Sequence, residues 1–134
     1  MKQTAKIIMR NFKIKELGYD FMGYAPQLNE SYSFHHLIIP KRKGGKCEYW
    51  NGAILCSETS HPYLHLIENR DYELFSYITN EMIEMNLKGH LDLENLRNIH
   101  NLLLQFEREH SSDTNSKGQL LIKQQYTNRP DLFI

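Results

Sequence analysis

Two stretches in the second half of the chain repeat apolar residues every three or four positions, the spacing of one face of an α-helix. Residues 71–86 carry leucine, phenylalanine, isoleucine and methionine at this spacing, and residues 93–110 repeat the pattern. Lys88-Gly89 ends the first predicted helix, and Asp92 can cap the second. Because each helix must bury its apolar face, we expect the two to pair and to supply much of the core.

A different pattern precedes these helices and predicts two strands. Residues 33–39 are rich in aromatic and β-branched side chains and stop at Pro40, which cannot donate a ladder hydrogen bond. After a basic loop that contains glycine, residues 49–56 predict a second strand, which is interrupted or begins at Asn51-Gly52. Hydroxyl side chains then precede Pro62, so a helix should begin near His61.

These elements predict an α+β fold, in which a two-stranded hairpin is crossed by a short helix and the later helices pack on it. With 134 residues the chain has the length of one domain. We place that domain at residues 1–110, with its core motif at 33–67 and helical support at 71–110. Residues 111–134 are expected to be a linker and a C-terminal tail. In residues 1–30 neither the helical spacing nor the alternation of a strand dominates, so their secondary structure stays open.

Charge and cysteine content restrict the class of partner and the compartment. Residues 1–50 hold nine basic and four acidic side chains, whereas residues 51–110 hold four and ten, so an anionic partner should bind the first half. The two cysteines form no C-x-x-C pair and cannot build a four-thiolate zinc site. No apolar run approaches the roughly 20 residues that span a bilayer. We therefore expect a cytoplasmic protein with no membrane partner.

Four of the seven histidines lie within residues 35–65. His61 and His65 are four positions apart, so on a helix both rings lie on one face and can bind one divalent transition metal ion. His35 and His36 are adjacent, and neighbouring strand residues point to opposite faces. Both cannot bind the same ion unless the strand twists or ends there, which leaves one of them for another task.

The order of these residues is similar to the HNH (His-Asn-His) motif of the ββα-metal endonucleases, over about a quarter of the chain. The similarity is carried by Phe34-His35-His36-Leu37-Ile38-Ile39-Pro40-Lys41-Arg42-Lys43-Gly44-Gly45, by Asn51-Gly52-Ala53-Ile54-Leu55-Cys56 and by His61-Pro62-Tyr63-Leu64-His65.

The resemblance implies a one-metal endonuclease that hydrolyses phosphodiester bonds in DNA to 5′-phosphate and 3′-hydroxyl ends. It implies that His35, His61 and His65 hold one divalent ion, which is Mg²⁺, Mn²⁺, Ni²⁺ or Zn²⁺, and that His36 is the general base. Asn51 would either tie down the loop between the strands or approach the metal. RNA contains the same phosphodiester, and a homodimer would be needed to cut both strands of a duplex at once.

The chemistry of hydrolysis explains why such residues would suffice. An imidazole with a reference pKa of about 6.5 can take a proton from water near neutral pH. A metal ion neutralises charge that develops on the phosphate and the leaving oxygen. The basic loop between the strands would contact flanking phosphates without reading their sequence. Its cationic residues are Lys41, Arg42, Lys43 and Lys46.

Other interpretations stay open beside this one. Asn51-Gly52 is also a strong signal for a two-residue hairpin turn, which would place Trp50 opposite Ala53. Tyr49 and Trp50 either pack in the hairpin, which we favour, or stack on bases. The rival functions are a non-catalytic nucleic-acid-binding module that retains the HNH fold, and an interaction protein whose metal is purely structural.

Overall fold

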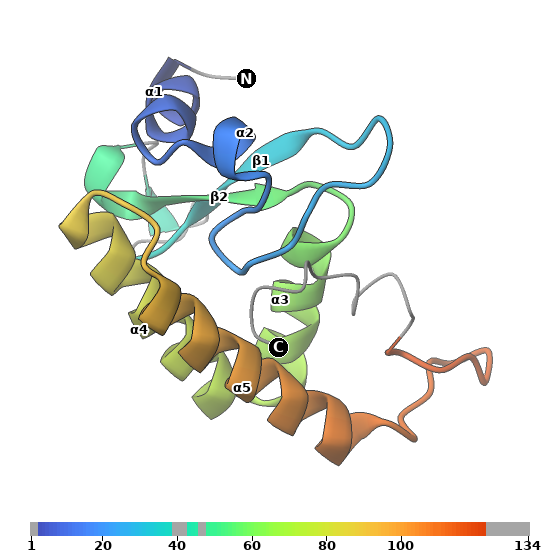
Figure 1. Ribbon diagram of the computed structural model, residues 1–134. Coiled ribbons are helices and arrows are strands. Elements are labelled where there is room, and N and C mark those ends of the chain that lie inside the picture. The colour runs from blue at the N-terminus through green and yellow to red at the C-terminus, as the bar shows by residue number, and fades with distance from the viewer. Residues whose placement is uncertain (1–2, 39–42, 46–47, 123–134) are drawn as a thin grey trace.

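A two-stranded antiparallel hairpin lies between two groups of helices in the computed structural model (Figure 1). The structure describes residues 3–38, 43–45 and 48–122. In chain order the elements are α1 (Gln3–Asn11), α2 (Ile14–Leu17), β1 (Tyr32–His36), the 3₁₀-helix η2 (Tyr49–Asn51), β2 (Gly52–Cys56), α3 (Ser60–Arg70), α4 (Tyr72–Lys88) and α5 (Leu93–His110). The predicted α+β fold, a hairpin followed by packed helices, is confirmed.

The register of the hairpin excludes a two-residue turn at Asn51-Gly52. His35 is opposite Ala53 and His36 is opposite Gly52, so a long connection joins the strands. Gly52 has φ −133°, an extended conformation, and begins β2. The turn interpretation is therefore wrong, and of the two forms predicted for the second strand the structure has the one that begins at Asn51-Gly52.

The first strand is shorter than predicted because one residue, Asn51, accepts the next two backbone hydrogen bonds. After His36 the backbone N–H of Ile38 donates to Asn51 Oδ1 at 2.8 Å, and that of Leu37 donates to the Asn51 carbonyl at 2.9 Å. Asn51 is fully buried. The ladder thus ends at His36, at the point where the asparagine holds the departing chain.

Close packing explains the glycine that follows Asn51. A Cβ atom at Gly52 would lie 2.3 Å from two ring atoms of Phe34 and 3.2 Å from Cδ1 of Ile8. No larger residue fits unless the Phe34 ring moves away. The ring covers the backbone of the neighbouring strand, a known way to stabilise a glycine in a sheet.

Helices cover both faces of the hairpin. In Figure 1, α1 and α2 lie above it and α3, α4 and α5 lie below it, and α1, α3 and α4 all contact β2. Every residue of β2 is consequently buried. Residues 3–17 thus form two short helices, which the weak periodicity of this region did not reveal.

The two long helices form as their spacing predicts. Asp71 caps α4 by accepting from Leu74 N–H, and Asp92 caps α5 by accepting from Glu94 and Asn95 N–H. Gly89 ends α4 in a left-handed conformation with φ 81°. The buried apolar residues are Leu74, Ile78, Met82 and Met85 on α4 and Leu96, Ile99, Leu103 and Phe106 on α5. Within the described part of the chain, no helix combines the length and apolar character needed to cross a membrane.

Candidate metal centre

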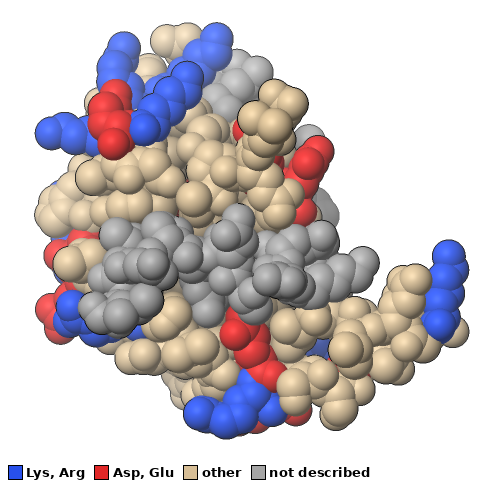
Figure 2. All heavy atoms as spheres, turned by 45° about the vertical axis from the view of Figure 1, so that its right-hand side comes forward, with Lys and Arg blue, Asp and Glu red and all other residues tan. Residues whose placement is uncertain are grey.

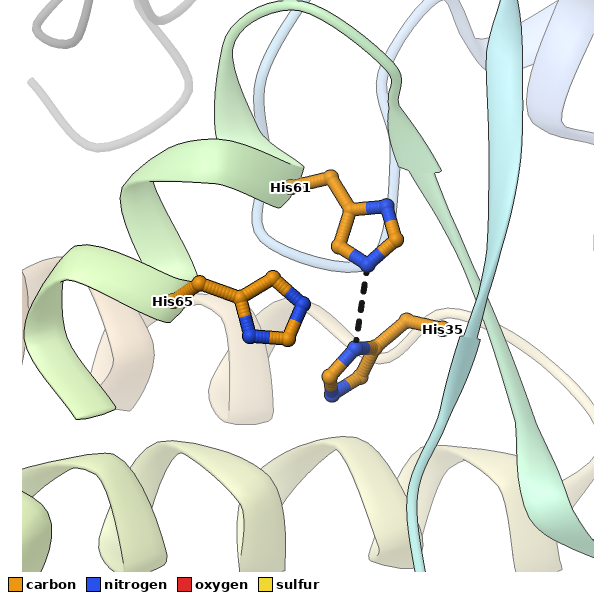
Figure 3. Close-up of side chains that lie close together, drawn as sticks. All are labelled: His35, His61 and His65. Carbon is orange, nitrogen blue, oxygen red and sulfur yellow. Dashed lines mark hydrogen bonds between the residues drawn. The ribbon is translucent and has the colours of Figure 1, made fainter. Parts of the chain in front are cut away.

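Three histidine rings from two elements converge beside the hairpin. His35 comes from β1, and His61 and His65 come from successive turns of α3 (Figure 3). One ring nitrogen from each lies within 4.8 Å of the others. The structure thus brings together the three side chains that the HNH resemblance names as metal ligands.

A serine holds the first of the helical histidines. Ser33 Oγ lies 3.2 Å from the Leu55 carbonyl, to which it donates, and 2.6 Å from His61 Nδ1. Because a hydroxyl has one proton, Ser33 then accepts from His61 Nδ1–H. This tautomer leaves a lone pair on His61 Nε2, which lies 3.3 Å from His35 Nδ1.

A carboxylate holds the second helical histidine in the same way. His65 Nδ1–H donates to Glu68 Oε1 at 3.2 Å, one helical turn further on. The other ring nitrogen of His65 points toward His35 and His61 in Figure 3. Histidines that bind metals commonly donate their second ring N–H to an oxygen, which fixes the tautomer and the ring orientation. Both rings of α3 have this arrangement.

Burial keeps two of the rings neutral. Desolvation, and to a smaller extent the charge of neighbouring histidines, lowers the pKa of His35 from 6.5 to about 3. The same causes lower the pKa of His61 to about 4. At neutral pH both imidazoles are therefore unprotonated, which is the form that coordinates a metal.

The ring of His35 also contains an unsatisfied atom. Its Nε2 is buried and has no hydrogen-bond partner among the described residues. The nitrogen of His35 that faces the other rings is Nδ1, which lies 3.3 Å from His61 Nε2 (Figure 3). Three imidazoles with ring nitrogens this close together fit a divalent transition metal ion.

His36 lies outside the three-histidine group. It is the last residue of β1, opposite Gly52, and its ring makes an edge contact with the Phe34 ring at a centroid distance of 4.9 Å. Phe34 and His36 share one face of the strand, and His35 is on the other. The side chain of His36 is therefore not available as a further ligand in the group that contains His35.

The other predicted site residues are placed as follows. Asn51 uses its side chain to hold the backbone after β1, so of its two predicted roles it has the one of tying down the loop between the strands. Lys43 is exposed in the connection between the strands. Lys41, Arg42 and Lys46 lie outside the described residues.

Asp20 is a buried carboxylate that the sequence analysis missed. Its Oδ1 accepts from the N–H groups of Met22 and Tyr24 at 2.9 and 3.0 Å. Its Oδ2 accepts from Cys56 N–H at 2.9 Å and from the Ser60 hydroxyl. Desolvation raises the pKa of Asp20, although these four donors oppose the shift. The carboxylate thereby joins the loop before β1 to the turn between β2 and α3, next to His61.

The fold and the centre define an α+β protein with three convergent histidines. Comparisons with protein-family models, with curated proteins and with solved structures find no match to this chain. The resemblance to the HNH motif therefore depends on the residues themselves.

Proposed function

We propose that this chain is a metal-dependent endonuclease of the HNH type that hydrolyses phosphodiester bonds in DNA. The convergence of His35, His61 and His65 from two elements is the observation that carries the proposal. A surface arrangement produced by composition alone would not also supply Ser33 and Glu68 as partners for the outer nitrogens of two rings. His36 is the next residue of the strand and is not one of the three converging rings, so it is the imidazole that we assign to proton transfer.

His35, His61 and His65 would hold one divalent ion. Three imidazole ligands favour Zn²⁺ or Ni²⁺ over Mg²⁺ and Mn²⁺, which prefer oxygen ligands. When bound, such an ion supplies Lewis-acid stabilisation of charge on the scissile phosphate and the leaving oxygen.

The remaining roles belong to side chains of the chain itself. His36 accepts a proton from the attacking water, a contribution that is typically about 10²- to 10⁴-fold in rate. Asn51 fixes the backbone just after His36 and so limits the movement of that ring. Lys43, Lys41, Arg42 and Lys46 contact flanking phosphates and set affinity without base readout.

A plasmid-nicking assay tests the proposed activity. Metal-free protein supplied with Mn²⁺, Ni²⁺, Zn²⁺ or Mg²⁺ should convert supercoiled DNA to the nicked form, and EDTA should abolish conversion. DNA ligase should reseal the nicks, because the products carry 5′-phosphate and 3′-hydroxyl ends. Cleavage that resists EDTA, or no cleavage with any of the four ions, would contradict the proposal. DNA binding without cleavage would identify the non-catalytic binding module instead.

A further inference from the structure

Two aromatic side chains remain exposed where the connection between the strands enters β2. Tyr49 and Trp50 are 52 % and 47 % exposed, although the sequence favoured packing within the hairpin. Ile38, on the other end of the same connection, is also exposed. Large aromatic rings left half in water offer flat faces that a ligand can cover.

The backbone under these rings is firmly held. Asn86 of α4 donates from Nδ2 to the carbonyl oxygens of Tyr49 and Gly52, both at 2.7 Å. The adjoining Asn51 is fully buried, and its N–H donates to the Glu48 carbonyl at 3.0 Å. Because the backbone is already ordered, a ligand that stacks on Tyr49 or Trp50 costs little additional conformational entropy.

The aromatic pair precedes the strand that pairs with the candidate base, and its 3₁₀-helix contacts a helix that carries exposed basic residues. Trp50 is two positions before Gly52, which is the cross-strand partner of His36. Helix α1 contacts η2 and β2, and its exposed Lys6 and Arg10 are four positions apart, on one face.

The basic surface continues beyond α1. Lys13 and Lys15 extend it into the turn and α2, where Glu16 is the acidic side chain among them. Figure 2 shows Lys and Arg gathered at the top of the molecule, over α1 and α2. We call Tyr49, Trp50, Lys6 and Arg10 the aromatic–basic surface.

We propose that the aromatic–basic surface binds single-stranded DNA, with Trp50 and Tyr49 stacking on unpaired bases and Lys6 and Arg10 contacting phosphates. Bases inside a duplex are already stacked on both faces, so these rings stack on unpaired bases without the cost of unstacking a duplex. The inference rests on the proposed function and names its substrate class: DNA that is single-stranded beside the bond to be cut. Positive charge beside two aromatic rings is the usual composition of a single-strand groove.

Trp50 makes the proposal directly measurable, because it is the sole tryptophan of the chain. An oligothymidylate of about twelve nucleotides, within the usual size of such sites, should quench its fluorescence. The titration is done in EDTA, so binding is observed without cleavage. Failure of this test would leave the nuclease proposal standing, and absence of nicking would leave this test unaffected.

Variants separate stacking from general affinity. By fluorescence anisotropy of a labelled oligothymidylate, Trp50→Ala should weaken binding about tenfold or more, while Trp50→Phe keeps most of the affinity. Tyr72→Ala is the matched control, since Tyr72 is 67 % exposed at the start of α4, roughly 20 Å along the helix from Asn86, and should change nothing. Replacing Lys6 and Arg10 together with glutamine should weaken binding and reduce its salt dependence.

Several results would overturn the inference. Unchanged Trp50 fluorescence at saturating oligothymidylate would do so, as would equal affinities for Trp50→Ala and Tyr72→Ala. Tighter binding to a duplex of the same length would show that unpaired bases are not what the surface recognises. Tighter binding to oligouridylate than to oligothymidylate would replace DNA by RNA as the ligand.

Discussion

Replacing His36 with alanine should lower the rate of plasmid nicking by roughly 10²- to 10⁴-fold, the usual contribution of a general base. Divalent-metal binding and the thermal midpoint should stay near those of the unchanged protein. The physical reason is the position of His36, on the strand face opposite His35 and outside the three-histidine group. Rates are measured from the loss of supercoiled plasmid at saturating metal.

The control is a histidine away from the centre. His90, in the exposed turn between α4 and α5, should tolerate alanine with no change in rate. A His36→Ala variant that nicks as fast as the His90→Ala variant would refute the role of His36. Equal loss of metal binding and activity would instead make His36 a ligand.

Replacing Asp20 with alanine should lower the free energy of unfolding by about 3 kcal/mol or more, as judged from the cost of leaving several buried donors without an acceptor. Alanine would leave the N–H groups of Met22, Tyr24 and Cys56 and the hydroxyl of Ser60 in a buried site without this acceptor. Metal affinity should fall as well, because Ser60 begins α3 and adjoins His61. Urea denaturation of the metal-free protein measures the first effect.

Two comparison variants sharpen this result. Asp20→Asn retains one acceptor oxygen and should lose less stability than Asp20→Ala. Asp113→Ala, which removes a partly exposed carboxylate paired with His110, should cost well under half as much. If Asp20→Ala unfolds at the same urea concentration as Asp113→Ala, the carboxylate does not have the structural role assigned to it.

Local sequence patterns predicted the elements that depend on local physics. The spacing of Leu74, Ile78 and Met82 requires a buried helical face, and Asp92 is a cap wherever a helix follows it. The aromatic and β-branched residues before Pro40 likewise indicated a strand from their local composition alone. These features depend on neighbours within one or two turns of the chain, which the sequence displays directly.

Contacts between distant residues were not predictable in this way. Asp20 meets Cys56 and Ser60, about forty positions away, and no local pattern marks a carboxylate as buried. The missing strand residues after His36 reflect the side chain of Asn51, another long-range contact.

Part of the candidate centre could be predicted from local sequence patterns. Ser33 is two positions before His35 and therefore on the same face of the strand, so alternation alone could have suggested it as a neighbour of the site. His61 and His65 share a helical face because they are four positions apart. The placement of His35 beside them required the HNH resemblance, because it depends on how the strand and the helix pack.

A second group of side chains offers a competing place for a metal ion. Ligand atoms of Asp71, Glu109 and His110 lie within 4.8 Å of one another, where α5 ends beside the start of α4. His110 already pairs with Asp113 at 2.7 Å. Any measurement of metal binding must therefore distinguish this group from the three histidines.

Titration calorimetry of the metal-free protein with Zn²⁺, repeated on His61→Asn and His110→Asn, tests the central claim most directly. We expect one tight ion per chain, an affinity reduced about 100-fold or more by His61→Asn, and no change with His110→Asn. Tight binding that survives His61→Asn, or that disappears with His110→Asn, would show that His35, His61 and His65 do not form the metal centre.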